Sequence, residues 1–599
     1  MVQHSPLGIR RRFPRSLLCA TIAMFGMPAT GCLPRYGHLD SRLSTRIHDR
    51  TRDIKPLELA PRESSIDGAS GATGLESGDS EIVDDVLEKV ADDFAGDDTG
   101  PEPVALSLAD LRLKTLRNNL DLEVALQDPG VARTIVSEEE AKFDSLISAG
   151  FQYKKQDLPE LDDDLVGFTS FNKDLDKQVV KLTQIEQQKE KLTYDLGLTV
   201  PLPTGGKVKL SGSMEDSAKL APREFEQHVS GVKFSLSQPL LRGAGYDANV
   251  ASIRLARLSA GKVAVKTKLA AIKVLAGAEK SYWKLYGTQK LREIRREQFN
   301  LAAQDLNMVK RRVEEGLSAE IEIIRSELGL TQRLEALIIA DTEYRLAQRE
   351  LRRIVNDDSF SLEADVQVEA ASEPRLVPLD ISRSNLAEAA LENRMELMEV
   401  ELSLAQDAIK IELEKNKALP YLMLSFEYGL LDRRGTFSSA WQHMWDFDNS
   451  ELSVGLRGEL PVTNEARRSR VRRAILERAQ RLSTQDMRRL SIRQEVFDAI
   501  DALNRDWLRI LAARKNVIVA GLNYEAERTQ FQEGLRTMRE VVEALTSLGD
   551  ARQKEVKAIV SYQVSQIDLA YATGTLLGYA RVGLEPLSLT DPFAFNGDE

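Results

Sequence analysis

Two stretches of the sequence decide the fold, and both contain the triplet Glu-Gly-Leu. The first is Val313–Leu328, Val-Glu-Glu-Gly-Leu-Ser-Ala-Glu-Ile-Glu-Ile-Ile-Arg-Ser-Glu-Leu. A variant of it returns as Phe531–Leu545, Phe-Gln-Glu-Gly-Leu-Arg-Thr-Met-Arg-Glu-Val-Val-Glu-Ala-Leu. Glycine readily adopts the left-handed conformation that ends a helix, and Gly316 and Gly534 each stand between two long helical patterns. Each stretch therefore predicts the tight tip of a helical hairpin.

The helical patterns on either side of the tips are long. Residues 247–315 and 464–533 contain no proline, so each can form one helix about 100 Å long. Ser318 and Thr537 are residue types that cap the start of a helix, and we expect them to open return helices that extend to residues 355 and 582. Apolar residues recur every seven positions along the first return helix, a pattern that an ordinary coiled coil would also show.

Ahead of each long helix the apolar residues alternate with a period of two, which predicts strands. The strands are expected at about 145–241 in the first copy of the pattern and at about 421–460 in the second. The first copy is longer, and the extra residues fit between 156 and 231, beside the turn signal Pro203-Thr204-Gly205-Gly206.

The first residues are typical of an export signal. Four arginines precede the short apolar run Leu17–Met27, so residues 1–31 are expected to be a signal peptide. Small residues then lead to Cys32, a pattern similar to a lipobox, in which the cysteine is lipidated. The alternative is ordinary signal cleavage, with Cys32 as a bystander. Residues 32–104 are rich in acidic and small residues and predict a mostly disordered linker from the lipid anchor.

The rest of the chain divides into two internal repeats. Residues 105–356 form the first repeat, with its tip at 316–318, and residues 380–583 form the second, with its tip at 534–537. Residues 357–379 connect the two, and 584–599 form a tail. The predicted fold is mainly α with a β part, each repeat consisting of amphipathic strands and a long α-helical hairpin.

Composition and motifs give no basis for an enzyme, a cofactor or a metal site. The chain has 599 residues and a net charge of −12, which argues against nucleic acid as a partner. None of its five histidines has metal-ligand spacing to another histidine or cysteine. Phosphate-binding loops and nucleophile elbows are missing from the sequence.

The duplicated order of strands, long helix, tip and return helix, behind a lipoprotein signal, resembles the TolC family of outer-membrane efflux proteins. The resemblance covers roughly Leu106–Gly583. The matching motifs are the two Glu-Gly-Leu tips, Asn118-Asn119-Leu120-Asp121-Leu122, Gln238-Pro239-Leu240-Leu241-Arg242-Gly243 and Leu419-Pro420.

The resemblance implies a homotrimer that forms a channel. Three copies would share a β-barrel in the outer membrane and an α-helical barrel in the periplasm. A periplasmic adaptor, the membrane fusion protein, would dock at the tips and join the channel to an inner-membrane transporter. The chain would then be the passive export conduit of a tripartite efflux pump or a type I secretion system.

The resemblance also implies roles for residues near the tips. The adaptor-docking residues would be Gly316, Leu317, Ser318, Gly534, Leu535, Arg536 and Thr537. The family closes its periplasmic end with an aromatic residue, an arginine and several acids, which here correspond to Phe531, Arg536, Glu322, Glu540 and Glu543. We expect this gate to open by an iris-like untwisting that separates Arg536 from its carboxylates. Phe531 lacks the hydroxyl of the family's tyrosine.

Several points stay open at the level of the sequence. The insert between residues 156 and 231 allows either four or six barrel strands from each copy, or a hairpin that caps the barrel. A periplasmic structural coiled-coil lipoprotein without a pore is the first alternative function. An enzyme on a helical stalk is the second, and it would require a polar catalytic cluster. The exported substrate is not indicated.

Overall fold

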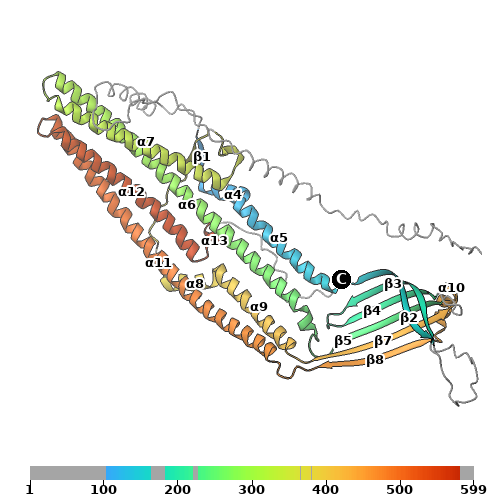
Figure 1. Cartoon of the computed structure of the whole chain (residues 1–599). Helices are drawn as coiled ribbons and strands as arrows, with labels where there is room; N and C mark the ends of the chain where they lie inside the picture. The colour runs from blue at the N-terminus through green and yellow to red at the C-terminus, as the bar shows by residue number, and fades with distance from the viewer. Residues whose placement is uncertain (1–102, 163–182, 220–226, 365, 380, 581–599) are drawn as a thin grey trace, which may run out of the picture. The chain divides into compact units, whose positions relative to one another are not determined.

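The computed structural model describes residues 103–162, 183–219, 227–364, 366–379 and 381–580, all within one compact unit, Lys89–Glu599. The expected signal, Cys32 and almost all of the linker therefore lie outside the described residues, as does the tail. Helices predominate, and a single large sheet accompanies them (Figure 1). Among the described helices, none combines the length and the apolar character that crossing a membrane requires.

The first half of the chain forms the following elements in order: β1 (Val104–Leu106), α4 (Leu108–Asn118), α5 (Leu120–Glu140), η1 (Ala141–Phe143), β2 (Leu146–Asp162), β3 (Thr183–Pro201), β4 (Lys207–Lys219), β5 (Gln227–Pro239), α6 (Tyr246–Glu314), α7 (Ile321–Val355), η2 (Asp358–Phe360) and β6 (Val368–Ala370). The second half forms α8 (Arg383–Asn393), α9 (Met395–Lys417), β7 (Tyr421–Arg434), α10 (Phe437–His443), η3 (Met444–Asp446), β8 (Ser450–Glu459), α11 (Glu465–Gln532), α12 (Met538–Ala572) and α13 (Leu576–Tyr579).

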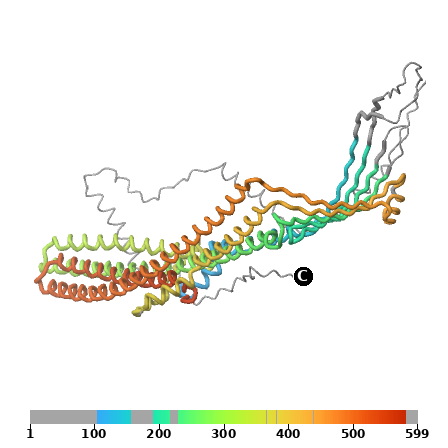
Figure 2. Tube along the Cα trace, turned by 90° about the horizontal axis from the view of Figure 1, so that it is seen from below, coloured from blue at the N-terminus to red at the C-terminus, as the bar shows by residue number. Residues whose placement is uncertain are grey.

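The four long helices form two hairpins that run side by side (Figures 1 and 2). Helix α6 packs on α7, α11 packs on α12, and α12 also contacts α6 and α7. The short helices α5 and α9 cover the part of α6 nearest the sheet, and α11 packs on the other side of α9. The local order in this layer is therefore α5, α6, α9, α11.

The helical pattern of the sequence from Ser107 towards Phe143 forms two helices, not one. Asn119 ends α4 and begins α5 with an extended backbone, φ −68° and ψ 120°, and its side chain accepts the N–H of Leu122. Arg394 separates α8 from α9 with nearly the same angles, φ −71° and ψ 120°. Asparagine favours helix N-caps, and its cap interrupts a helical period that otherwise continues.

The predicted bounds of both return helices also need correction. The first begins at Ile321, not at Ser318, because position 321 holds no Glu or Gln to complete a capping box with Ser318. The second ends at Ala572, not at 582. Gly574 has φ +72°, and a Cβ there would lie 3.0 Å from the Asn393 backbone, so the chain turns where it approaches Asn393.

Six described strands form one antiparallel sheet in the order β2-β3-β4-β5-β7-β8. The strands lie within the predicted regions, with β2 extending to Asp162 and β7 to Arg434. The 156–231 insert contributes to this sheet instead of standing apart from it, because β4 pairs with both β3 and β5.

The two faces of the sheet differ in chemistry. One row of cross-strand partners is apolar on every strand: Ile147, Leu198, Leu210, Phe234, Tyr428 and Leu452. The next row, on the opposite face, is small or polar on every strand: Ser148, Gly197, Ser211, Lys233, Gly429 and Glu451. Ile147 is 74% exposed and Leu452 is 64% exposed, so the described part of the chain leaves this apolar row largely uncovered.

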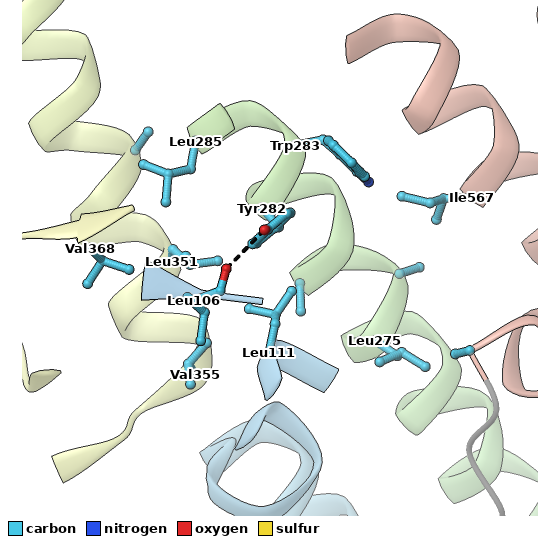
Figure 3. Packing of buried hydrophobic residues seen from close by; sticks show 14 of the residues in the cluster. Leu106, Leu111, Leu275, Tyr282, Trp283, Leu285, Leu351, Val355, Val368 and Ile567 are labelled. Atoms are coloured by element: carbon cyan, nitrogen blue, oxygen red, sulfur yellow. Dashed lines mark hydrogen bonds between the residues drawn. The ribbon is translucent and has the colours of Figure 1, made fainter. Parts of the chain in front are cut away.

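The main core lies where the start of the chain meets the connecting segment (Figure 3). Strand β1 pairs in parallel with β6, so residues 104–106 and 368–370 meet against α6 and α7. The Tyr282 hydroxyl donates to the Leu106 carbonyl at 2.9 Å and accepts the Ser372 N–H at 2.8 Å. The buried tyrosine hydroxyl thus has both a hydrogen-bond acceptor and a donor, and these two bonds hold the connecting segment against the helices.

Candidate functional site

The two tips have the same backbone geometry. Gly316 has φ +75° and Gly534 has φ +78°. In each tip the glycine N–H bonds to the carbonyl three residues earlier, and the following leucine N–H reaches the carbonyl five residues earlier, at 2.8 Å for Leu317 and 2.9 Å for Leu535. This is the Schellman arrangement that glycine favours at a helix end. Leu317 and Leu535 are 65% and 71% exposed, so both tips present an apolar side chain to solvent.

The residues after the tips behave differently in the two hairpins. Thr537 caps α12, and its N–H bonds to the Glu540 carboxylate at 2.9 Å, which completes a capping box. The pKa of Glu540 is lowered mainly by the hydrogen bond from the Thr537 hydroxyl, and the nearby charge of Arg536 lowers it only slightly. Ser318 instead accepts the Arg312 Nε–H at 3.3 Å.

Within the chain, Arg536 is not bonded to the expected gate carboxylates. Its Nε donates to Gln530 Oε1 at 3.1 Å and lies 3.4 Å from Glu527 Oε2, so it bridges back to α11. Glu543 pairs with Arg539 at 2.9 Å, and Glu322 pairs with Arg325 at 2.6 Å. Each proposed gate carboxylate therefore has a partner on its own helix or cap.

Phe531 is buried, and it connects the two hairpins through Arg312. The Arg312 guanidinium lies 5.2 Å from the centre of the Phe531 ring, and its Nη1 donates to the Gln532 carbonyl at 2.9 Å. An arginine over an aromatic face is attracted by the negative charge above the ring. The sequence reasoning missed Arg312, although its place four residues before Gly316 was a possible signal.

A buried charge cluster lies deeper in the bundle, and the sequence reasoning missed it as well. Asp305 on α6 is 3% exposed and lies 3.7 Å from Arg528 on α11. Burial raises the pKa of Asp305, against the lowering effect of Arg528. Arg333 on α7 donates to the Val542 carbonyl at 3.2 Å and to the Thr546 hydroxyl at 3.0 Å, both on α12. Arg333 is also close enough to Asp305 for its charge to lower the pKa of that carboxyl, so the cluster connects all four long helices.

The comparisons with known proteins agree with this geometry. Residues 386–575 match the family model described as outer membrane efflux protein. The outer membrane protein TolC of Salmonella enteritidis is 24% identical over 279 residues, which cover 43% of this chain and 56% of that protein.

The family model and the curated relative thus make this chain similar to the TolC family of outer-membrane efflux proteins.

Two solved structures of outer-membrane proteins share the fold of this chain. The Campylobacter jejuni CmeC channel has 14% identity and a TM-score of 0.56, over 87% of this chain and 94% of that one. VceC from Vibrio cholerae has 13% identity and a TM-score of 0.55, over 78% and 96%. The sequence match to the curated TolC protein is shorter and spans little more than half of its length.

Proposed function

We propose that this chain is the outer-membrane channel of a tripartite efflux pump or a type I secretion system. Three copies would enclose one β-barrel and one α-helical barrel. The channel would be a passive conduit, docked by a periplasmic adaptor and supplied by an inner-membrane transporter. Its sheet would lie in the outer membrane, with the helices in the periplasm and Cys32 lipidated.

The observation that carries the proposal is the two-faced sheet. A sheet with one apolar and one polar face suits a barrel wall between lipid and a water-filled lumen. The edge strands β2 and β8 pair on one side only among the described strands, and a closed barrel is the arrangement that satisfies such edges in lipid. With six strands in the sheet, we favour six barrel strands from each copy over four, and over a separate cap.

The exposed apolar rows also bear on the alternative without a pore. A structural coiled-coil lipoprotein would have no use for an uncovered apolar sheet face, which in water would promote aggregation. The tips supply the second part of the proposal. Leu317 and Leu535 are exposed apolar anchors on a turn of fixed geometry, which suits docking by an adaptor.

The gate is proposed to form between copies. Arg536 on one copy would leave Glu527 and Gln530 and contact Glu540 or Glu543 of the next. An arginine can hold carboxylates by two parallel hydrogen bonds, so a ring of three such contacts would narrow the bore.

Single-channel recording in planar lipid bilayers tests the proposal. The purified chain is expected to insert and to conduct in discrete steps, with low conductance in the closed state. Arg536→Ala is expected to raise that conductance. Lys310→Ala is the matched control and is expected to leave the conductance unchanged, because Lys310 on α6 is 46% exposed and pairs with Glu327 on α7, and neither residue belongs to the proposed gate.

The outcomes separate the channel from the gate. A chain that never conducts in bilayers would refute the channel. Equal closed-state conductance in wild type, Arg536→Ala and Lys310→Ala would leave the channel standing and refute the gate. The lipid anchor is tested apart from both, by labelling with radioactive palmitate, which Cys32→Ala is expected to abolish.

A further inference from the structure

We propose that the α10 segment, which comprises α10, η3 and Phe447, lies at the membrane surface on the apolar face of the sheet. Its Trp441 and Trp445 would occupy the boundary between the lipid chains and the headgroups. The inference rests on the proposed channel and adds how that channel is held at a fixed depth in the bilayer. Its evidence is the face of the sheet that the segment covers, the level at which the apolar face ends, and the exposure of the two tryptophans.

The α10 segment covers the apolar face of the sheet and not the polar one. It follows β7 at the end of the sheet away from the long helices, and α10 packs on β5 and β7 (Figure 1). Leu430, two residues after Tyr428 of the apolar row, is 6% exposed, and the next partners on the same face, Ser230 and Asp432, are 0% and 5% exposed. Leu431, on the opposite face, is 45% exposed. The segment therefore lies on the face that the proposed channel turns towards lipid.

The segment also lies at the level where the apolar face ends. The cross-strand row that contains Ser230 holds Phe151 on β2 and Tyr194 on β3, whose ring centres are 5.3 Å apart. On the same face, four residues past Phe151, Lys155 pairs with Glu190 at 3.3 Å. Charged side chains therefore follow just beyond this row. A girdle of aromatic residues is typical of the position where a membrane sheet passes from lipid chains to headgroups.

The α10 segment supplies aromatic rings where β5 and β7 have none. In this row the two strands carry a serine and an aspartate, which would face lipid if the segment did not cover them. Ala440 and Met444 are buried, at 0% and 2% exposed. Trp441 and Trp445, each the next residue along the chain, are 37% and 50% exposed, and their rings meet edge to face with centres 6.1 Å apart. The segment thus continues the aromatic row of β2 and β3 across β5 and β7.

The side chains of the segment suit a lipid surface. Tryptophan has an apolar body and one N–H donor, and it is enriched at membrane–water interfaces for that reason. Phe447, directly after η3, adds a third ring that is 58% exposed. Residues 437–447 contain no lysine or arginine. Burial of aromatic rings, and not attraction to anionic headgroups, would therefore hold the segment at the membrane.

The place of the segment on the sheet argues against a second copy as its partner. Another copy would continue the sheet at β2 or β8, which are the edges among the described strands. The segment lies over β5 and β7, and β8 separates β7 from the nearer edge. A membrane, unlike a neighbouring copy, borders every strand of the apolar face.

Quenching of tryptophan emission tests the inference on the full-length protein in phosphatidylcholine vesicles. Bromine atoms on the lipid chains quench only those tryptophans that they contact. The chain has four tryptophans, and the other two, Trp283 and Trp507, lie on α6 and α11. The emission is expected to fall more when the bromines are close to the headgroup than when they are near the chain ends. The double variant Trp441→Phe, Trp445→Phe is expected to lose this quenching, and the matched control Trp507→Phe is expected to keep it.

Conductance recorded from the same vesicles separates this inference from the channel. A chain that neither conducts nor is quenched refutes the proposed channel and the membrane-surface segment together. A conducting chain that neither lipid quenches, or a double variant that is quenched as much as the wild type, refutes the segment alone. Stronger quenching by bromines near the chain ends would place the tryptophans inside the bilayer and contradict their position at its surface. Shielding from both the brominated lipids and aqueous iodide would mean that another copy covers the segment, which also refutes the inference.

Discussion

Arg394 stands at the break between α8 and α9 and ties three parts of the second half together. Its side chain is 4% exposed. It donates two hydrogen bonds to the Glu396 carboxylate at 3.0 and 2.9 Å, one to Glu495 on α11 at 2.8 Å, and one to the Ala572 carbonyl at the end of α12 at 3.1 Å. Burial raises the pKa of Glu396, but hydrogen bonds, those from Arg394 foremost, outweigh it and leave the pKa below its ordinary value.

Arg394→Ala is expected to lower the free energy of unfolding by about 3–5 kcal/mol, because it leaves a half-buried carboxylate and a buried carbonyl without their donor. Arg394→Lys keeps the charge but cannot form the paired bonds to Glu396, so an intermediate loss is expected. Urea titration of the detergent-solubilised protein, followed by the helical signal in circular dichroism, measures both.

Arg383→Ala is the control for this measurement. Arg383 lies at the other end of α8 and pairs with Asp501, also on α11, but their side chains are 60% and 61% exposed. An exposed pair contributes at most about 1 kcal/mol. If Arg394→Ala costs no more than Arg383→Ala, the reasoning from burial is wrong.

Three further predictions concern other contacts. Burial raises the pKa of Asp506, but hydrogen bonds from Arg505, Ser565 and Arg509 outweigh it and lower the pKa. The charged carboxylate therefore stabilises the fold fully above the ordinary pKa of aspartate, about 4, and this stabilisation is lost as the pH falls through the lowered pKa. Asp506→Asn is expected to make the free energy of unfolding depend less on pH in that range, which urea titration at a series of pH values measures. A Cβ at Gly549 would overlap the buried Gln298 amide, so Gly549→Ala should cost about 1–3 kcal/mol, whereas Gly521→Ala, with its nearest atom at 3.9 Å, should stabilise by up to about 1 kcal/mol in the same titration. Gly534→Ala meets no atom within 4 Å but must hold φ +78°, so a loss of about 1–2 kcal/mol is expected, and a neutral result by urea titration would contradict the left-handed tip.

Local signals in the sequence predicted the tips and the order of helices and strands. The left-handed backbone at each tip favours glycine, and this preference can be recognised without knowing which distant residues lie nearby. The break at Asn119 also has a local signal, because asparagine is a preferred N-cap. The helical spacing of apolar residues continues on both sides of Asn119, so the sequence reads as one helix there. The bounds of single strands were not predictable in the same way, because the outer parts of β2 and β3 are rich in charged residues, and there backbone pairing extends beyond the apolar alternation.

Contacts between segments far apart in the sequence were not predictable in the same way. Arg312 and Phe531 are 219 positions apart, and nothing in either stretch indicates that they meet. Nothing in the sequence around Asp305 indicates burial, yet the structure buries it next to Arg528. Such pairs depend on how the two hairpins pack, which the sequence pattern of one hairpin does not contain.

The local partners of the gate residues have a consequence for how a gate could work. If the Arg536 guanidinium had no partner in the separate chain, every contact between copies would add its full strength to the closed state. Instead Arg536 already bonds to Gln530 and lies near Glu527, and Glu543 already pairs with Arg539. Closing then exchanges one set of exposed ion pairs for another, and exposed pairs differ by about 1 kcal/mol or less. A small free-energy difference of this kind is what an adaptor bound at Leu317 and Leu535 could reverse, because a ligand shifts an equilibrium only by its difference in affinity for the two states.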